Sequence, residues 1–288
     1  MNVMSSGRCL TVAVAIALSA SACAKAPPME KGEKEAAMSE DPNQRRTIDG
    51  YTYTTAPVEA RLGPHRYAFP ANLYDSQIGP AIGGGVGLTL MWPELKAAPP
   101  GTRSSRSMTD HYRAISISVD YIDGVPIAEL LERRTSTDAT SEEDSVYRAD
   151  PRRRLDMRKA GAEQFGLTTY AIDEAQMEKF GKALEQQTGM PTKRNPNVED
   201  DWYIARSTDG GIASFIKCRK LQDGRDGLRL EGDQLVEDES VPVSSCTHYF
   251  VDGDNDLSIR LAYPRVLLKD WKAMEDAARA LLATYRIE

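Results

Sequence analysis

Histidine is scarce in this sequence: three residues in 288, which stand far apart at His65, His111 and His248. No H-E-x-x-H or C-x-x-C motif is present, so the sequence lacks the ligand spacings that are typical of zinc sites. The chain also lacks the G-x-S-x-G turn of α/β-hydrolases, the S-D-N and K-T-G companions of penicillin-recognising enzymes, and the G-K-[ST] ending of a phosphate-binding loop. We therefore expect a protein that is not an enzyme, with no catalytic residue, no metal and no cofactor.

Positive charge is also in short supply. The 36 Lys and Arg residues stand against 43 Asp and Glu residues, which gives a formal net charge of −7. This balance opposes binding to nucleic-acid phosphates. With so many carboxylates, any pair could be nominated as a glycosidase acid and nucleophile, so abundance alone identifies no site. The basic run Arg152–Arg154 predicts a solvated face or charge pairing with the acidic run Glu142–Asp144.

The marked apolar run of the N-terminus extends from Cys9 to Ala20 and follows Arg8. It is short for a membrane span and is typical of a secretory signal. Ala20, Ser21 and Ala22 precede Cys23, and together they resemble the lipobox of bacterial lipoproteins. We expect residues 1–22 to be a signal peptide and Cys23 to carry lipid. The alternative is cleavage near Ala22, which leaves a soluble periplasmic protein with a spare thiol.

The segment after the signal is charged, contains prolines and has no apolar period. Such a composition is typical of a disordered tether, so we assign residues 23–47 to a lipidated flexible tether. By resemblance to lipoproteins, Ala24 in place of Asp favours the outer membrane. The expected location is therefore the periplasm, with a lipid anchor in the outer membrane.

Two cysteines remain after the signal and the lipid site are set aside, namely Cys218 and Cys246. In an oxidising compartment, two such thiols predict one disulfide. Closing this loop stabilises the fold by about 3–4 kcal/mol in the chain-entropy description. Two unpaired buried thiols are the alternative.

The stretch SFIKC, Ser214–Cys218, could be the S-x-x-K pair of an acylating enzyme or part of a β-strand. Ile212, Ser214, Ile216 and Cys218 fall on one face of a period-two pattern, whereas Lys217 falls on the other. The acylating pair needs both side chains on one face, one helical turn apart. The pattern therefore predicts a strand.

A hairpin and a helix follow. Residues 246–251 and 257–263 alternate in the manner of strands around a polar turn, DGDND, which predicts a hairpin. Calcium binding by this turn is disfavoured, because Leu257 and Tyr263 stand where the loop needs glycine and glutamate. Apolar residues then recur at helical spacing, which predicts an amphipathic helix packed on the sheet: Leu268, Trp271, Met274, Ala278, Leu281 and Tyr285.

The fold class that these patterns predict is α+β, with mainly antiparallel sheets, packed helices and one disulfide. We divide the folded part into an N-terminal lobe, residues 48–190, and a C-terminal lobe, residues 191–288. The strands at 115–121 and 257–263 share Ser, Ile and Tyr positions and are each followed by an expected helix. Two related β-β-α lobes would explain this match, but chance in β-rich sequence explains it as well.

Several segments together resemble the immunity lipoproteins of antibacterial secretion systems, including immunity proteins for type VI lipase effectors: the lipoprotein signal, the tether, HRYAFPANL, LMWP, DDWYIAR, IKC, SSCTHYFV and LSIRLAYPRVLLKDWKAME. The resemblance implies a periplasmic protein that binds and neutralises a secreted toxin, with a phospholipase as one candidate. It does not indicate which residues contact the toxin. The alternatives are an envelope-assembly or ligand-binding lipoprotein without catalytic activity, or a hydrolase with an unfamiliar site.

Overall fold

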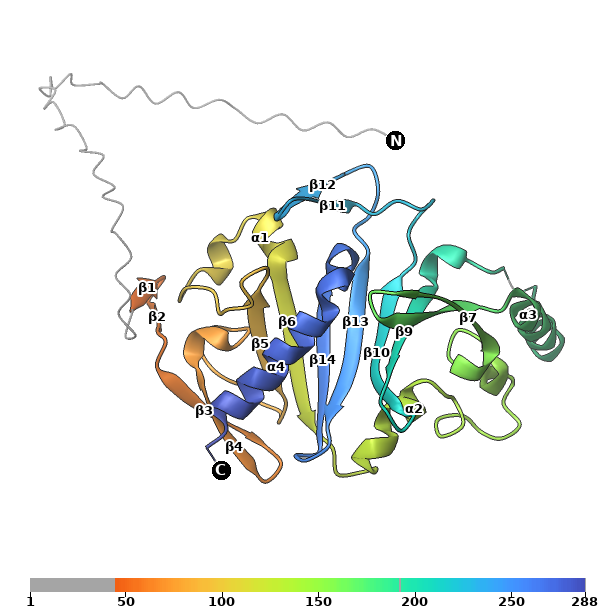
Figure 1. The fold of residues 1–288 in the computed structure, drawn as a ribbon, viewed down its shortest axis with the longest axis horizontal. Coiled ribbons are helices and arrows are strands. Elements are labelled where there is room, and N and C mark those ends of the chain that lie inside the picture. The colour runs from red at the N-terminus through yellow and green to blue at the C-terminus, as the bar shows by residue number, and fades with distance from the viewer. Residues whose placement is uncertain (1–44, 192, 288) are drawn as a thin grey trace, which may run out of the picture. The chain divides into compact units, whose positions relative to one another are not determined.

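The computed structural model describes residues 45–191 and 193–287, and its main feature is one sheet of eight strands (Figure 1). The strands lie in the order β5-β6-β14-β13-β10-β9-β8-β7, and all neighbours are antiparallel. The expected α+β class with a mainly antiparallel sheet is therefore confirmed. The strand bounds are β5 Val86–Met91, β6 Ala114–Tyr121, β7 Arg158–Gln164, β8 Leu167–Ile172, β9 Asp200–Arg206, β10 Ile212–Arg219, β13 Ser245–Asp252 and β14 Leu257–Pro264.

The middle of this sheet comes from the C-terminal segment of the chain, and both edges come from the N-terminal segment. Ile259 of β14 pairs with Val119 of β6 on one side, and Tyr203 of β9 pairs with Thr169 of β8 on the other. The larger buried cluster also draws side chains from both segments. The expected lobe boundary at residue 190 therefore lies within one continuous sheet.

Within the described residues four α-helices accompany the sheet, and two of them are long. They are α1 Met108–Arg113, α2 Leu130–Arg134, α3 Glu174–Thr188 and α4 Trp271–Tyr285. Helix α2 follows β6 and α4 follows β14, but α1 lies between β5 and β6, whereas no helix separates β13 from β14. Helix α2 is only five residues long. Pro126 precedes it, and a 3-10 turn at Ile127–Glu129 takes up the intervening residues, since proline favours the beginning of a helix over its interior.

Two-stranded hairpins flank the main sheet. Their strands are β1 Arg46–Ile48 with β2 Tyr51–Tyr53, β3 Pro57–Leu62 with β4 His65–Pro70, and β11 Leu228–Glu231 with β12 Gln234–Glu237. The first strand begins inside residues 23–47, which the sequence assigns to the tether. The last residues assigned to the tether therefore include part of a strand.

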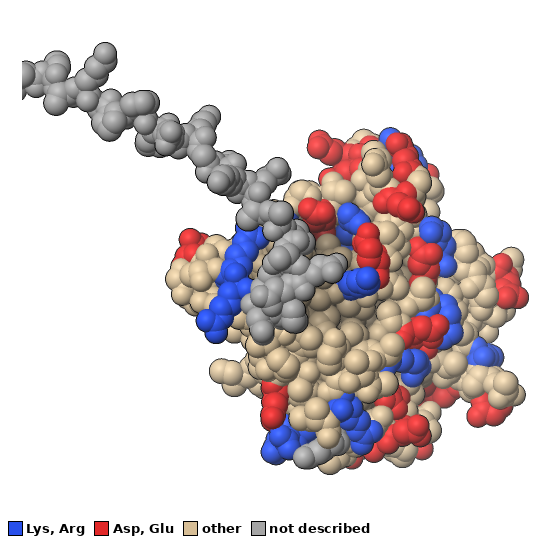
Figure 2. All heavy atoms as spheres, turned by 60° about the vertical axis from the view of Figure 1, so that its left-hand side comes forward, with Lys and Arg blue, Asp and Glu red and all other residues tan. Residues whose placement is uncertain are grey.

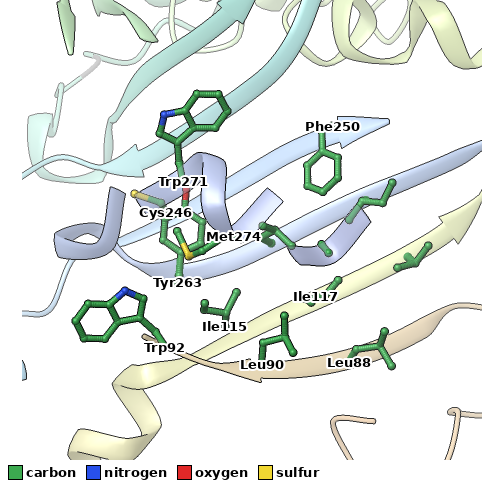
Figure 3. Close-up of a cluster of buried hydrophobic side chains, with 14 of the residues drawn as sticks. Leu88, Leu90, Trp92, Ile115, Ile117, Cys246, Phe250, Tyr263, Trp271 and Met274 are labelled. Atoms are coloured by element: carbon green, nitrogen blue, oxygen red, sulfur yellow. The ribbon is translucent and has the colours of Figure 1, made fainter. Parts of the chain in front are cut away.

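Helix α4 runs diagonally over one face of the sheet and buries the main core beneath it (Figures 1 and 3). Trp271, Met274 and Ala278 are buried as predicted, and Leu282 is buried as well. Two indole nitrogens fix the start of the helix. Trp92 Nε1 donates to Asp270 Oδ2 at 3.0 Å, and Trp271 Nε1 donates to the Phe165 carbonyl at 2.8 Å. The predicted amphipathic helix on the sheet is confirmed.

Strand β10 contains a bulge that changes part of the predicted alternation. Ile216 and Cys218 belong to the core under α4, whereas Phe215 packs on the opposite face of the sheet. The pairing with β9 shifts register between Ile212 and Ser214, and Ile212 packs with the Phe215 cluster instead of with Ser214. The prediction for Ile212 is therefore wrong, because a bulge inserts one extra residue and reverses the facing of the residues before it.

Charges of both signs are interspersed over the face that Figure 2 shows, around a stretch without charged side chains. No helix within the described residues is long and apolar enough to cross a bilayer.

Candidate functional site

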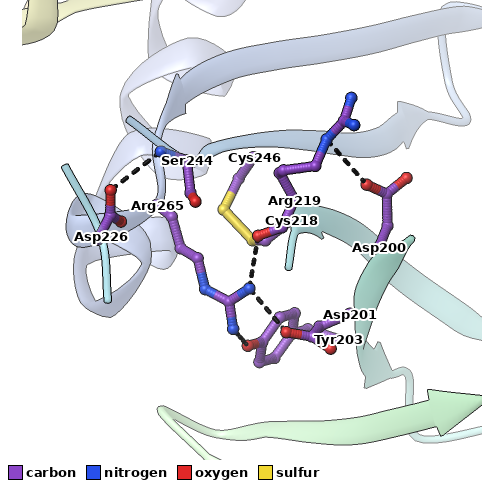
Figure 4. Close-up of a disulfide and its surroundings, with 9 residues drawn as sticks. All are labelled: Asp200, Asp201, Tyr203, Cys218, Arg219, Asp226, Ser244, Cys246 and Arg265. Atoms are coloured by element: carbon purple, nitrogen blue, oxygen red, sulfur yellow. Dashed lines mark hydrogen bonds and ion pairs between the residues drawn. A yellow bond between two sulfur atoms is a disulfide. The ribbon is translucent and has the colours of Figure 1, made fainter. Parts of the chain in front are cut away.

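The predicted disulfide joins Cys218 of β10 to Cys246 of β13 (Figure 4). The two residues are direct partners in the register of these neighbouring strands, and both side chains are buried. The bond closes a loop with a sequence separation of 28 residues, which corresponds to about 3–4 kcal/mol of stabilisation. Because both cysteines are buried and bonded to each other, they stabilise the sheet and are not free to react.

Arg265 ties the strand ends around the disulfide together. Its guanidinium donates to the Arg219 carbonyl and to the Tyr203 hydroxyl, each at 2.7 Å, and pairs with Asp201 Oδ2 at 2.7 Å (Figure 4). Burial raises the pKa of Tyr203, although the neighbouring Arg265 opposes the shift. The phenol therefore stays neutral at physiological pH and accepts from the arginine, so this cluster fixes the end of the sheet.

A buried polar cluster lies farther along β10, on the same face as the disulfide and under α4. The Ser214 hydroxyl donates to Glu275 Oε2 at 2.6 Å, and His248 Nε2 lies 3.2 Å from the same oxygen. Arg279 Nε donates to the other carboxylate oxygen of Glu275 at 2.9 Å. Ser, His and Glu thus meet in one place, as in a hydrolase triad, but the serine and the histidine both contact the carboxylate.

This arrangement does not support nucleophilic catalysis. A catalytic histidine has to contact the serine whose proton it takes, and here Ser214 and His248 are only 2% and 0% exposed. Burial lowers the pKa of His248, which keeps the ring neutral. Burial alone would raise the pKa of Glu275, but hydrogen bonds from His248 and Ser214 outweigh it and lower the pKa to about 2. The cluster therefore anchors α4 to the sheet.

A second feature lies on the face of the sheet that α4 does not cover, where three rings form a row across β9, β10 and β13. The Trp202 and Phe215 rings meet edge to face at 4.7 Å between centroids, and the Phe215 and Tyr249 rings stack at 5.8 Å. Trp202 and Phe215 are buried, whereas Tyr249 is half-buried. Helix α2 and the chain after it lie against this part of the sheet.

Cations stand over both ends of this row. The guanidinium carbon of Arg158 lies 3.9 Å from the Trp202 ring centroid. At the other end, the guanidinium carbon of Arg134 and the Nζ of Lys217 lie 4.6 and 5.6 Å from the Tyr249 centroid. We call these three cations and the three rings the cation–aromatic array. Alternation along β9, β10 and β13 places each ring on the face opposite the main core, but it does not indicate that these three strands are neighbours.

Arg158 is the most buried cation of the array, at 8% exposure. Its guanidinium donates to four backbone carbonyls at 3.0–3.3 Å, those of Pro151, Arg152, Tyr170 and Asp200. Within the described residues it forms no ion pair with a carboxylate. Burial lowers its pKa to about 10, although Asp200 and other acids partly offset the shift.

A cavity of about 690 Å³ opens beside the array, and Arg158 and Tyr170 form part of its wall. Charged side chains of both signs line it, including Arg154 and Asp156, which are paired at 2.8 Å. Arg154 also pairs with Asp138, and Arg152 pairs with Asp150. Of the two expectations for this arginine run, the pairing with Glu142–Asp144 is wrong, because its partners among the described residues are Asp138, Asp150 and Asp156. Arg152 and Arg153 are exposed, as a solvated face requires.

The structure does not describe the expected lipid site, and its described residues contain no candidate metal site. Cys23 lies outside the described residues, as do the expected signal peptide and most of the tether. In the ranges 45–191 and 193–287, no group of three or more His, Cys, Asp or Glu side chains is placed to hold a metal ion.

No family model and no curated protein sequence matches the chain. A solved structure does match: Smlt3025, an immunity protein of the Stenotrophomonas maltophilia type IV secretion system, is 48% identical in sequence. The similarity covers 85% of this chain and 99% of that one, with a TM-score of 0.78. The chain belongs to this family of immunity proteins. The immunity resemblance inferred from the sequence is thereby confirmed, although the relative serves a type IV system and the sequence features pointed toward type VI effectors.

Proposed function

We propose that this chain is a periplasmic immunity lipoprotein that binds a secreted antibacterial toxin and neutralises it. The observation that carries the proposal is the 48% identity to an immunity protein over 85% of the chain. Function is inferred more safely from this family membership than from the fold, because one fold hosts many functions.

Three features support the finer parts of the proposal. The disulfide between Cys218 and Cys246 suits an oxidising compartment. The N-terminal sequence with Cys23 suits export and a lipid anchor, with the outer membrane as the expected location. The sealed Ser214–His248–Glu275 cluster suits a rigid inhibitor rather than a hydrolase. The sequence resembles immunity proteins of lipase effectors, so a phospholipase is the first toxin to test.

The alternative is a ligand-binding or envelope-assembly lipoprotein, and the cavity beside Arg158 is the observation that favours it. A bound small molecule would then be the partner, and loss of the chain would not affect survival under attack. The two functions therefore predict different survival under attack, and survival can be measured without knowing the binding site.

That readout is competition between siblings. A strain without the chain should be killed by wild-type siblings that deliver the effector encoded next to its gene, and a plasmid copy of the full chain should restore survival. A copy without residues 1–22 should not restore it, because the product would stay in the cytoplasm. Full survival of the deletion strain, with effector delivery verified, would favour the ligand-binding alternative.

A further inference from the structure

Three cations stand over the rings of the cation–aromatic array: Arg134, Arg158 and Lys217. None of them forms an ion pair with a carboxylate within the part of the chain that the structure describes. Burial lowers the pKa of Lys217, and repulsion from Arg134, Arg158 and Arg153 lowers it further. Asp200 opposes this repulsion, but its carboxylate is paired with Arg219 at 3.9 Å.

Other arginines of the same chain are neutralised within the fold. Arg154 pairs with two aspartates, and Arg194 pairs with Glu174 and Glu199. The chain has more acidic than basic residues, so partners are plentiful. Gathering unpaired cations at a partly buried place is unfavourable, because charges removed from water need a counter-charge. An anion from outside the chain would remove this penalty.

The array is open to such an anion at its Tyr249 end. Arg134 is exposed and Lys217 is half-buried, and both stand over the Tyr249 ring. The half-buried Tyr249 ring beneath them offers apolar surface beside the charges, and the buried Phe215 ring stacks against it. A cationic rim over an aromatic floor suits a side chain that presents a carboxylate together with apolar atoms, as an exposed protein loop does.

We propose that the cation–aromatic array receives an Asp or Glu side chain from a loop of the toxin that this chain binds. The inference rests on the proposed function and adds the place of contact and the chemistry of the partner. Arg134 and Lys217 contact the carboxylate, Tyr249 packs against the apolar part of the loop, and Arg158 holds the surrounding backbone carbonyls in place.

The test replaces the two accessible cations together, Arg134→Gln with Lys217→Gln. Neither side chain is among those that hold elements together by hydrogen bonds, so the variant should fold, which thermal unfolding checks. Arg133→Gln is the matched control, because this residue is adjacent on α2 and is paired with Glu129 at 4.0 Å. Arg158 is left unchanged because of its four carbonyl contacts.

The probe is the purified effector encoded next to the gene of this chain, and binding is followed by surface plasmon resonance. We expect the double variant to bind about 10- to 100-fold more weakly, mainly through faster dissociation, while the control stays within about twofold of the unchanged protein. Equal affinity of the double variant and the control would overturn the inference. Failure of the unchanged protein to bind would instead overturn the proposed function, and this inference with it.

A charge reversal identifies the partner group. Lys217→Glu should abolish tight binding, and an Asp-to-Lys or Glu-to-Lys change at one toxin position should restore it. If free glutamate or inorganic phosphate at micromolar concentration displaced the toxin from the unchanged protein, a small anion would be the occupant and the inference would be wrong.

Discussion

The Ser214 hydroxyl and the Glu275 carboxylate meet at 2.6 Å although 61 residues separate them, and this contact joins β10 to α4. His248 and Arg279 complete the shell of the same carboxylate. The four residues thus bind the covering helix to the middle of the sheet.

Replacing Glu275 should destabilise the fold. Glu275→Gln keeps the shape but removes the charge that Arg279 and His248 face, and we expect a loss of about 2–4 kcal/mol in the free energy of unfolding. Asp276→Asn on the exposed side of the same helix is the control and should change it by less than about 0.5 kcal/mol. Urea denaturation measures both, and equal effects would show that the buried cluster is not an anchor.

Acid should weaken the fold through His248. Because burial lowers the pKa of this ring, the folded state resists protonation while the unfolded state takes up a proton below about pH 6.5. The resulting stability is present above that pH and is lost as pH falls, by about 1 kcal/mol between about pH 7 and pH 5.5. Glu275 adds a further loss below about pH 4.5, toward its folded pKa of about 2. The pH dependence of unfolding in His248→Gln should be flatter above pH 5; an unchanged slope would contradict the assignment.

Reduction should destabilise the chain by removing the Cys218–Cys246 bond. We expect a loss of about 3–4 kcal/mol on adding a reductant before denaturation. The double variant Cys218→Ser with Cys246→Ser should show the lower stability from the start and no response to the reductant. Labelling of both thiols in the folded, unreduced protein would contradict the bond.

Lipidation of Cys23 is a separate prediction. The unchanged chain should be found in the membrane fraction with acyl mass on Cys23, whereas Cys23→Ser should leave it soluble or unprocessed. Mass spectrometry of the mature N-terminus decides this, and an unmodified Cys23 in a soluble protein would show that the lipobox resemblance is misleading.

Local patterns were enough to predict β6, β10, β13, β14 and the covering helix α4. The hairpin of β13 and β14 follows from two alternating runs around one polar turn, and the disulfide follows from two remaining thiols in an exported chain. The facing of Ile212 was missed because a bulge leaves no mark in a period-two pattern.

The arrangement between distant segments could not be predicted from such patterns. That β6 pairs with β14, and β8 with β9, depends on contacts between residues far apart in the sequence. The array was missed for the same reason: Trp202, Phe215 and Tyr249 form a row only after their three strands are placed side by side.

The most direct measurement of the central claim is growth of a susceptible host that exports the neighbouring effector to its periplasm. Co-expression of the full chain, with its residues 1–22, should restore growth, whereas the chain without residues 1–22 should not. Arrest of growth to the same extent with and without the exported chain would contradict its role as an immunity protein for that effector.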